Sequence, residues 1–133
     1  MKKVLFVCVE NSCRSQIAEG IAKHFYSKVI EAYSAGSRPS GVVNPDAIAV
    51  MREIGVDISK NSSKGFRDLP TQDFDYVVTL GCKDTCPFFP AKSFKEWEIP
   101  DPKGKDIEFF RRTRERLREE IKRLVNPLPF DKE

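Results

Sequence analysis

The stretch that decides the fold is residues 4–15, VLFVCVENSCRS, in which an apolar run stops abruptly at Cys8. The four apolar residues before Cys8 are typical of a buried strand, and the residues from Ser15 onward have the apolar spacing of a helix. The order is therefore strand, tight loop, helix. In such a loop the backbone N–H groups and the helix dipole converge on one concavity, which suits an anion.

The loop also carries side chains that an attack on an oxyanion needs. Cys8 lies at its mouth, where the same field favours the thiolate, the nucleophilic form of cysteine. Arg14 offers a planar guanidinium to a tetrahedral oxyanion, and Ser15 can hydrogen-bond the sulfur or cap the helix. The alternative is a buried, inert Cys8 with Arg14 on the surface, and the strand–loop–helix setting argues against it.

We therefore expect Cys8, Arg14 and Ser15 to be catalytic. The expected oxyanion-binding loop consists of Val9, Glu10, Asn11, Ser12, Cys13 and Arg14.

Length and composition indicate a single catalytic domain over residues 1–133. No apolar run is long enough to span a membrane, and the N-terminus lacks a signal-peptide pattern, so we expect a cytoplasmic, monomeric protein with no membrane partner. The net charge of +3 comes mainly from the C-terminal helix, where Lys and Arg alternate with Glu. No basic stripe is interleaved with aromatic residues, and we therefore expect no nucleic-acid partner.

Strand-like and helix-like segments alternate along the chain. Strands are predicted at 2–7, 29–34, 74–80 and 93–99, and helices at 15–27, 45–54 and 106–125, with a short helical turn at 66–69. This pattern predicts an α/β fold with a four-stranded parallel sheet and helices on both faces. Ligands bind beyond the carboxyl ends of such strands, so the loops carrying Cys8 and Cys82 should lie at the same sheet edge.

The four cysteines fall into two pairs, Cys8/Cys13 and Cys82/Cys86. In a cytoplasmic protein they indicate catalysis, redox chemistry or metal binding more than a disulfide framework. Cys82 and Cys86 could be redox partners of Cys8, half of a metal site, or packing residues. The spacing typical of zinc ligands is absent and the single histidine, His24, lies on the first predicted helix. We favour redox partners and expect no metal and no cofactor.

Asp101 lies between Pro100 and Pro102, which restrict the local backbone and aim the carboxyl group. A protonated Asp101 beside a bound oxyanion could act as general acid to a leaving oxygen. An ordinary aspartate in a proline-rich turn is an equally good interpretation of these three residues alone.

These motifs resemble the low-molecular-weight tyrosine phosphatase superfamily. The segment VCVENSCRS at 7–15 is similar to its phosphate loop, and QIAEG at 16–20 to its arsenate reductase branch, where Gln replaces the usual Pro of the phosphatases. Further matches are SAG at 34–36, NP-x-A at 44–47, GVDIS at 55–59, VTL at 78–80 before the second Cys pair, and Trp97 before Asp101-Pro102. The resemblance spans roughly residues 3–125.

The resemblance implies reduction of arsenate to arsenite by a cysteine relay, for arsenic detoxification. Cys8 would attack arsenate held by the loop amides and Arg14, while Asp101 protonates the departing oxygen. Cys82 would then attack Cys8 and release arsenite, and Cys86 would attack Cys82. The resulting Cys82–Cys86 disulfide would be reduced by thioredoxin. Because the gap between these two cysteines is shorter than is usual in the family, a low-molecular-weight thiol is the alternative reductant.

Two other functions remain open. One is a tyrosine phosphatase or small phosphomonoesterase on the same scaffold; such phosphatases tend to carry Tyr after the Asp-Pro pair, where this chain has Lys103. The other is a non-enzymatic module that senses oxyanions or redox state.

Thioredoxin-coupled members of the family can bind potassium behind the loop, through residues that match Asn11 and Glu19. Lys64 stands where another ligand of that site is acidic. Since an ammonium group could replace the cation, we expect no potassium site.

Overall fold

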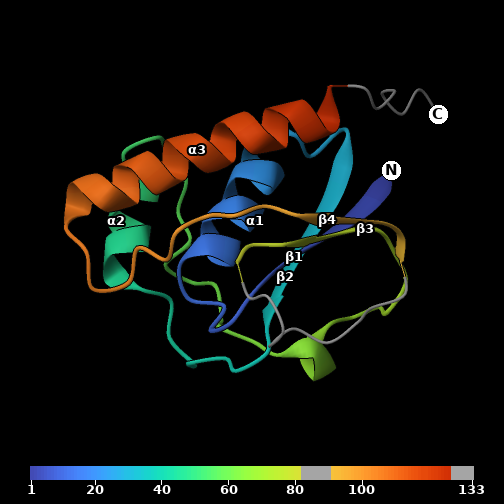
Figure 1. Ribbon diagram of the computed structural model, residues 1–133, viewed down its shortest axis with the longest axis horizontal. Coiled ribbons are helices and arrows are strands. Elements are labelled where there is room, and N and C mark those ends of the chain that lie inside the picture. The colour runs from blue at the N-terminus through green and yellow to red at the C-terminus, as the bar shows by residue number, and fades with distance from the viewer. Residues whose placement is uncertain (82–90, 127–133) are drawn as a thin grey trace.

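The computed structural model describes residues 1–81 and 91–126. The elements in chain order are β1 (Lys2–Cys8), α1 (Arg14–Phe25), β2 (Ile30–Gly36), α2 (Pro45–Arg52), the 3₁₀ helix η1 (Phe66–Asp68), β3 (Phe74–Thr79), β4 (Ala91–Glu96) and α3 (Ile107–Val125) (Figure 1). Strands and helices alternate as the sequence predicts. The largest shift is in β4, which begins and ends two to three residues before the predicted 93–99. None of the helices in these ranges is long and apolar enough to cross a bilayer.

The strands in the described residues form one parallel sheet in the order β2-β1-β3-β4. Strand β1 is paired on both sides, and its residues from Val4 to Cys8 are buried, as the continuous apolar run predicts. The chain passes from β1 to β2 on one side and later to β3 on the other. The strand order therefore switches at the carboxyl end of β1, where ligands bind in open parallel sheets, and Cys8 lies there.

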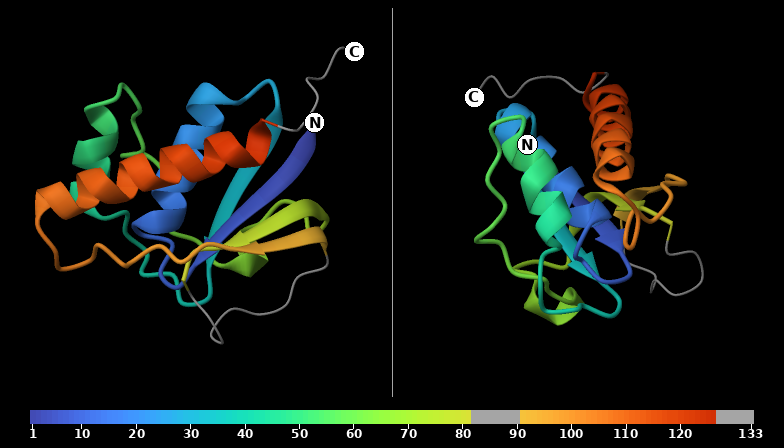
Figure 2. Two further views of the ribbon diagram at one scale, coloured as in Figure 1. Left: turned by 45° about the horizontal axis from the view of Figure 1, so that its top comes forward. Right: turned by 90° about the vertical axis from the view of Figure 1, so that its left-hand side faces the viewer.

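Helical segments cover both faces of the sheet, but unequally (Figure 2). On one face Val4 and Phe6 of β1 pack in a core with α1, α2 and α3. On the other face the alternate residues Leu5 and Val7 pack with Leu69, beside η1. The prediction of an α/β sheet covered on both sides is confirmed, and within the described residues the second cover is the short helix η1 with its flanking chain.

Helix α3 is rich in basic residues. It begins at the cap Asp106, whose carboxylate accepts a hydrogen bond from Phe109 N at 3.0 Å. One stripe of the helix is buried, and its charged stripe faces solvent. There Arg111 and Arg114 both bind Glu53 at the end of α2, each at 2.7 Å. Both of these arginines of α3 therefore pair with a carboxylate.

The loop after β1 rests directly on Gly36, the last residue of β2. A Cβ atom at this position would lie 2.6 Å from Val9 O and 2.8 Å from Asn11 N, closer than real contacts allow. Gly36 N also donates to Lys64 O at 2.9 Å, which ties in the segment before η1. Only glycine permits this approach of two backbones.

We predict that Gly36→Ala displaces the loop and lowers the free energy of unfolding by about 1–3 kcal/mol, because the added methyl group overlaps backbone that cannot rotate away. Urea unfolding measures this loss. The matched control is Gly65→Ala, since Gly65 pairs with Gly36 but a Cβ there meets nothing nearer than 3.5 Å. Equal stabilities of the two variants would contradict the prediction.

Candidate active site

The carbonyl groups of the loop after β1 are bonded away from the pocket, to the chain that follows β2. The bonds are Ser37 N to Cys8 O (3.3 Å), Arg38 N to Val9 O (2.7 Å), Ser40 N to Glu10 O (3.1 Å) and Asn44 N to Ser12 O (3.0 Å). In a trans peptide the N–H points opposite to the C=O. The N–H groups that share these peptides therefore face the other side of the loop, which is the arrangement an anion requires.

Cys8 ends β1 with its Sγ 2.9 Å from the hydroxyl oxygen of Ser15. The same hydroxyl oxygen accepts a hydrogen bond from Asn11 Nδ2 at 2.7 Å. An amide nitrogen is only a donor, so this bond occupies a lone pair and leaves the hydroxyl hydrogen of Ser15 for the sulfur. A thiolate can only accept a hydrogen bond, so Ser15 is the donor when Cys8 acts as the nucleophile. The structure thus gives Ser15 the first of its two predicted roles.

Asn11 holds the loop together from the inside. It is fully buried and adopts a left-handed backbone with φ of 50°, which Asn tolerates better than most residues. Its Nδ2 also donates to Ser34 Oγ at 3.0 Å. Its Oδ1 accepts from Gln16 Nε2 and from Lys64 N, both at 2.9 Å. Four bonds from one side chain therefore set the loop, the start of α1 and the end of β2 against one another.

Lys64 places its ammonium group behind the loop. Its Nζ lies 3.6 Å from Glu19 Oε1 and 3.3 Å from Ser34 Oγ. Glu19 is buried and its other oxygen bonds Lys23 at 2.8 Å. The oxygens that could hold a monovalent cation here already face one, so these residues do not fit a potassium ion. Elsewhere in the described residues, no three His, Cys, Asp or Glu side chains are grouped closely enough to hold a metal.

Arg14 is the first residue of α1 and is buried although charged. Its Nη1 donates to Ile99 O at 2.9 Å, and its Nη2 lies 3.7 Å from Asp101 Oδ2. A Cβ on Gly81 would come within 2.6 Å of Nη1, so the chain after β3 passes directly against the guanidinium. Ile99 and Asp101, in the turn after β4, therefore orient the Arg14 guanidinium. The sequence alone does not reveal this role of the turn.

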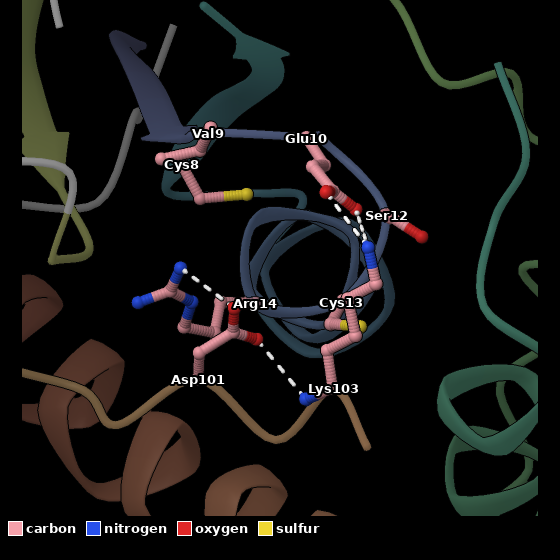
Figure 3. A pocket seen from close by; sticks show the side chains of 8 residues that line it. All are labelled: Cys8, Val9, Glu10, Ser12, Cys13, Arg14, Asp101 and Lys103. Atoms are coloured by element: carbon pink, nitrogen blue, oxygen red, sulfur yellow. Dashed lines mark hydrogen bonds and ion pairs between the residues drawn. The ribbon is translucent and has the colours of Figure 1, made fainter. Parts of the chain in front are cut away.

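Asp101 faces the same pocket as Cys8 and Arg14 (Figure 3). Its side chain is 52% exposed, and its Oδ1 accepts a hydrogen bond from Lys103 N at 3.1 Å. The pocket has a volume of about 160 Å³, and its lining residues are Cys8, Val9, Glu10, Ser12, Cys13, Arg14, Asp101 and Lys103. A tetrahedral oxyanion in this pocket would lie between a thiol, a guanidinium and a carboxyl group.

Cys13 lines the pocket as a neutral thiol. Burial, together with the neighbouring Asp101 and Cys8, raises the pKa of Cys13 from 9.0 to about 12. A thiol with this pKa stays protonated and is a poor nucleophile. Of the two thiols in the loop, Cys13 is therefore a wall of the pocket, and Cys8 is left as the expected nucleophile.

The sequence motifs did not reveal one contact of this pocket. Lys103 Nζ reaches across to Glu10 and bonds both carboxylate oxygens, at 3.0 and 2.8 Å (Figure 3). Lys103 directly follows Asp101-Pro102, but only the fold shows that this turn lies beside Glu10. Cys82 and Cys86 lie outside the described residues. Gly81, which precedes Cys82, is the residue that contacts Arg14.

Comparison with known proteins gives the family of the chain. The family model described as low molecular weight phosphotyrosine protein phosphatase matches residues 3–133. The chain is 41% identical over 128 residues to a glutaredoxin arsenate reductase of Synechocystis sp., an alignment that covers 94% of this chain and 97% of that protein.

Solved structures give the same result. An arsenate reductase in the phosphate binding state superposes with a TM-score of 0.86 at 39% identity, covering 97% of this chain and all (100%) of the other. The thioredoxin-dependent arsenate reductase of Corynebacterium glutamicum superposes with a TM-score of 0.73 at 36% identity, covering 93% of this chain and 62% of that one.

We predict that Cys13 makes the protein less stable at alkaline pH. Between the ordinary thiol pKa of 9.0 and the folded value of about 12, the unfolded chain loses this proton and the folded chain keeps it. Rising pH therefore favours unfolding over that range. Urea unfolding of the reduced protein at a series of pH values should show a steeper loss in the wild type than in Cys13→Ser. Parallel curves would contradict the assignment of a neutral, buried thiol.

Proposed function

The chain belongs to the low molecular weight phosphotyrosine protein phosphatase family, and we propose that within it this protein is an arsenate reductase acting in arsenic detoxification. The observation that carries the proposal is the placement of Cys8 beside Ser15, in a small pocket that it shares with Arg14 and Asp101. Relatives and solved structures at about 40% identity, over most of the chain, are arsenate reductases.

The first step is nucleophilic. Arsenate enters the pocket, where the loop N–H groups and the Arg14 guanidinium bind its oxygens. The Cys8 thiolate attacks arsenic and forms a sulfur–arsenic bond, while one arsenic–oxygen bond breaks. Asp101 supplies the proton with which that oxygen leaves as water. The Arg14 guanidinium lies 3.7 Å from the Asp101 carboxyl group, so these two groups reach the same bound arsenate.

The second step is the reduction. The Cys82 thiolate attacks the sulfur of Cys8, and a Cys8–Cys82 disulfide forms. The electron pair of the sulfur–arsenic bond passes to arsenic, which leaves as arsenite. Cys86 then attacks Cys82, which frees Cys8 and leaves a Cys82–Cys86 disulfide. The contact between Gly81 and Arg14 supports these roles, because the chain enters the segment with Cys82 at the edge of the site.

An external reductant must reopen the last disulfide. We propose thioredoxin or, as the alternative, a low-molecular-weight thiol system. One relative is named as thioredoxin-dependent and another as a glutaredoxin enzyme. Thiols stay reduced in the cytoplasm, so that compartment fits the chemistry. We propose that the enzyme acts there as a single-domain monomer.

A phosphatase on the same scaffold is the less favoured function. Phosphate and arsenate share charge and shape, so the pocket should hydrolyse phosphomonoesters weakly. A sensor without turnover would keep the pocket but reduce no arsenate with any reductant.

We predict that potassium, compared with sodium, raises neither the melting temperature nor the activity, because the Lys64 ammonium already faces Glu19. Lys64→Ala should lower the free energy of unfolding by about 1–3 kcal/mol, since a buried carboxylate loses a charged partner. The control is Lys23→Ala, which removes the exposed partner of the same carboxylate and should cost about 0.5 kcal/mol. A potassium-specific rise in the wild type would overturn the prediction.

The relay is tested by arsenate reduction with a thioredoxin system. Cys8→Ser should be inactive, and Asp101→Asn should be slower by roughly a hundredfold or more, because the general acid is lost. In a single turnover without reductant, Cys86→Ser should still release one equivalent of arsenite, whereas Cys82→Ser should release none.

Each outcome has a distinct meaning. Full multiple-turnover activity in both Cys82→Ser and Cys86→Ser would show that the relay is wrong. Full activity in Cys86→Ser alone would favour a small-thiol route. Turnover by Cys8→Ser would overturn the assignment of the nucleophile.

A further inference from the structure

The pocket carries two acidic and two basic side chains, although its proposed substrate is an anion. Glu10 and Asp101 are acidic, and Arg14 and Lys103 are basic. Each carboxylate lies nearest to one of the cations: Asp101 to Arg14 at 3.7 Å, and Glu10 to Lys103 at 2.8 Å. Asp101 and Arg14 have roles in the proposed reaction. The side chains of Glu10 and Lys103 have none.

The Glu10–Lys103 pair joins two segments of the chain that are far apart in sequence. Glu10 belongs to the loop after β1, and Lys103 to the turn before α3 (Figure 3). The Lys103 ammonium bonds both oxygens of the carboxylate. The backbone N–H of Lys103 also holds Asp101 Oδ1 at 3.1 Å. The same residue therefore contacts the general acid with its backbone and the anion loop with its side chain.

An unpaired Glu10 would weaken the site. It would place a full negative charge at the rim of a pocket whose substrate carries the same sign. Glu10 cannot move away from the bound anion, because the loop that carries Glu10 also supplies the N–H groups that bind the anion. By Coulomb's law, a unit charge about 8 Å from a dianion in water changes its affinity roughly fivefold.

We propose that Lys103 is a further binding determinant of the pocket, which cancels the charge of Glu10 at the rim and so strengthens the binding of a doubly charged inorganic oxyanion. This rests on the proposed function, since it assumes that the pocket takes an oxyanion. The hydrogen bond to Glu10 raises the pKa of Lys103 above its ordinary value, which favours the charged ammonium.

The test is the affinity for inorganic phosphate, measured by titration calorimetry with the reduced full-length protein at low salt. Lys103→Met should bind phosphate roughly fivefold more weakly than the wild type, and Glu10→Gln roughly fivefold more tightly. The double variant Glu10→Gln/Lys103→Met and the charge-swapped variant Glu10→Lys/Lys103→Glu should both return to within about twofold of the wild type. High salt should reduce all these differences.

A gain of affinity in Glu10→Gln separates charge compensation from a merely structural role, because loss of a structural contact would weaken binding in every variant. The matched control is Lys92→Met. Lys92 pairs with Asp75 at 3.2 Å, at the opposite end of the parallel strands, and carries the same charge as Lys103. Lys92→Met should leave the phosphate affinity unchanged.

The inference is overturned if the two single variants shift phosphate affinity in the same direction, or if the double variant keeps the defect of Lys103→Met. Absence of phosphate binding in the wild type would also overturn it. Phosphate binding needs no reductant, so the proposed function is judged separately: a wild type that binds phosphate in this pattern but reduces no arsenate would refute only the proposed function.

Discussion

The active site depends on the side chain of Asn11. This fully buried amide joins the loop to α1 through Ser15 and to β2 through Ser34. Its oxygen is held by Gln16 and by the backbone of Lys64, which fixes the direction of the amide. The same amide donates to the Ser15 hydroxyl, which lies 2.9 Å from Cys8 Sγ, and so helps to position that hydroxyl beside the sulfur. A fully satisfied buried network of this kind specifies a single geometry.

Local patterns were sufficient to predict the elements and their order. The apolar run before Cys8 marks the central strand. Asn44-Pro45 marks the start of α2, where the Asn44 side chain accepts a hydrogen bond from Asp46 N at 2.8 Å. The position of Cys8 at the switch in strand order follows from the alternation of strands and helices. The same argument brings Gly81, the residue before Cys82, to the edge of the pocket.

Contacts between distant turns could not be predicted in this way. The bond from Arg14 to Ile99 O uses a backbone group, which leaves no mark on residue type. The Glu10–Lys103 pair joins residues 93 positions apart, in a chain with many charges of both signs. Nothing in the spacing distinguishes this pair from others until the fold brings the two turns together. The close approach at Gly36 is similar, since SAG at 34–36 shows a glycine but not the loop against it.

The outward hydrogen bonds of the loop have a thermodynamic consequence. The segment 37–44, which ends at the cap of α2, holds the loop in its anion-binding shape through hydrogen bonds within the protein alone. An oxyanion has about five non-hydrogen atoms, and at a ceiling of about 1.5 kcal/mol per atom it can contribute only about 7.5 kcal/mol to its own binding. A ligand this small could not also order a flexible loop. The preformed backbone therefore lets an anion of this size bind with little loss of conformational entropy, and bind at all.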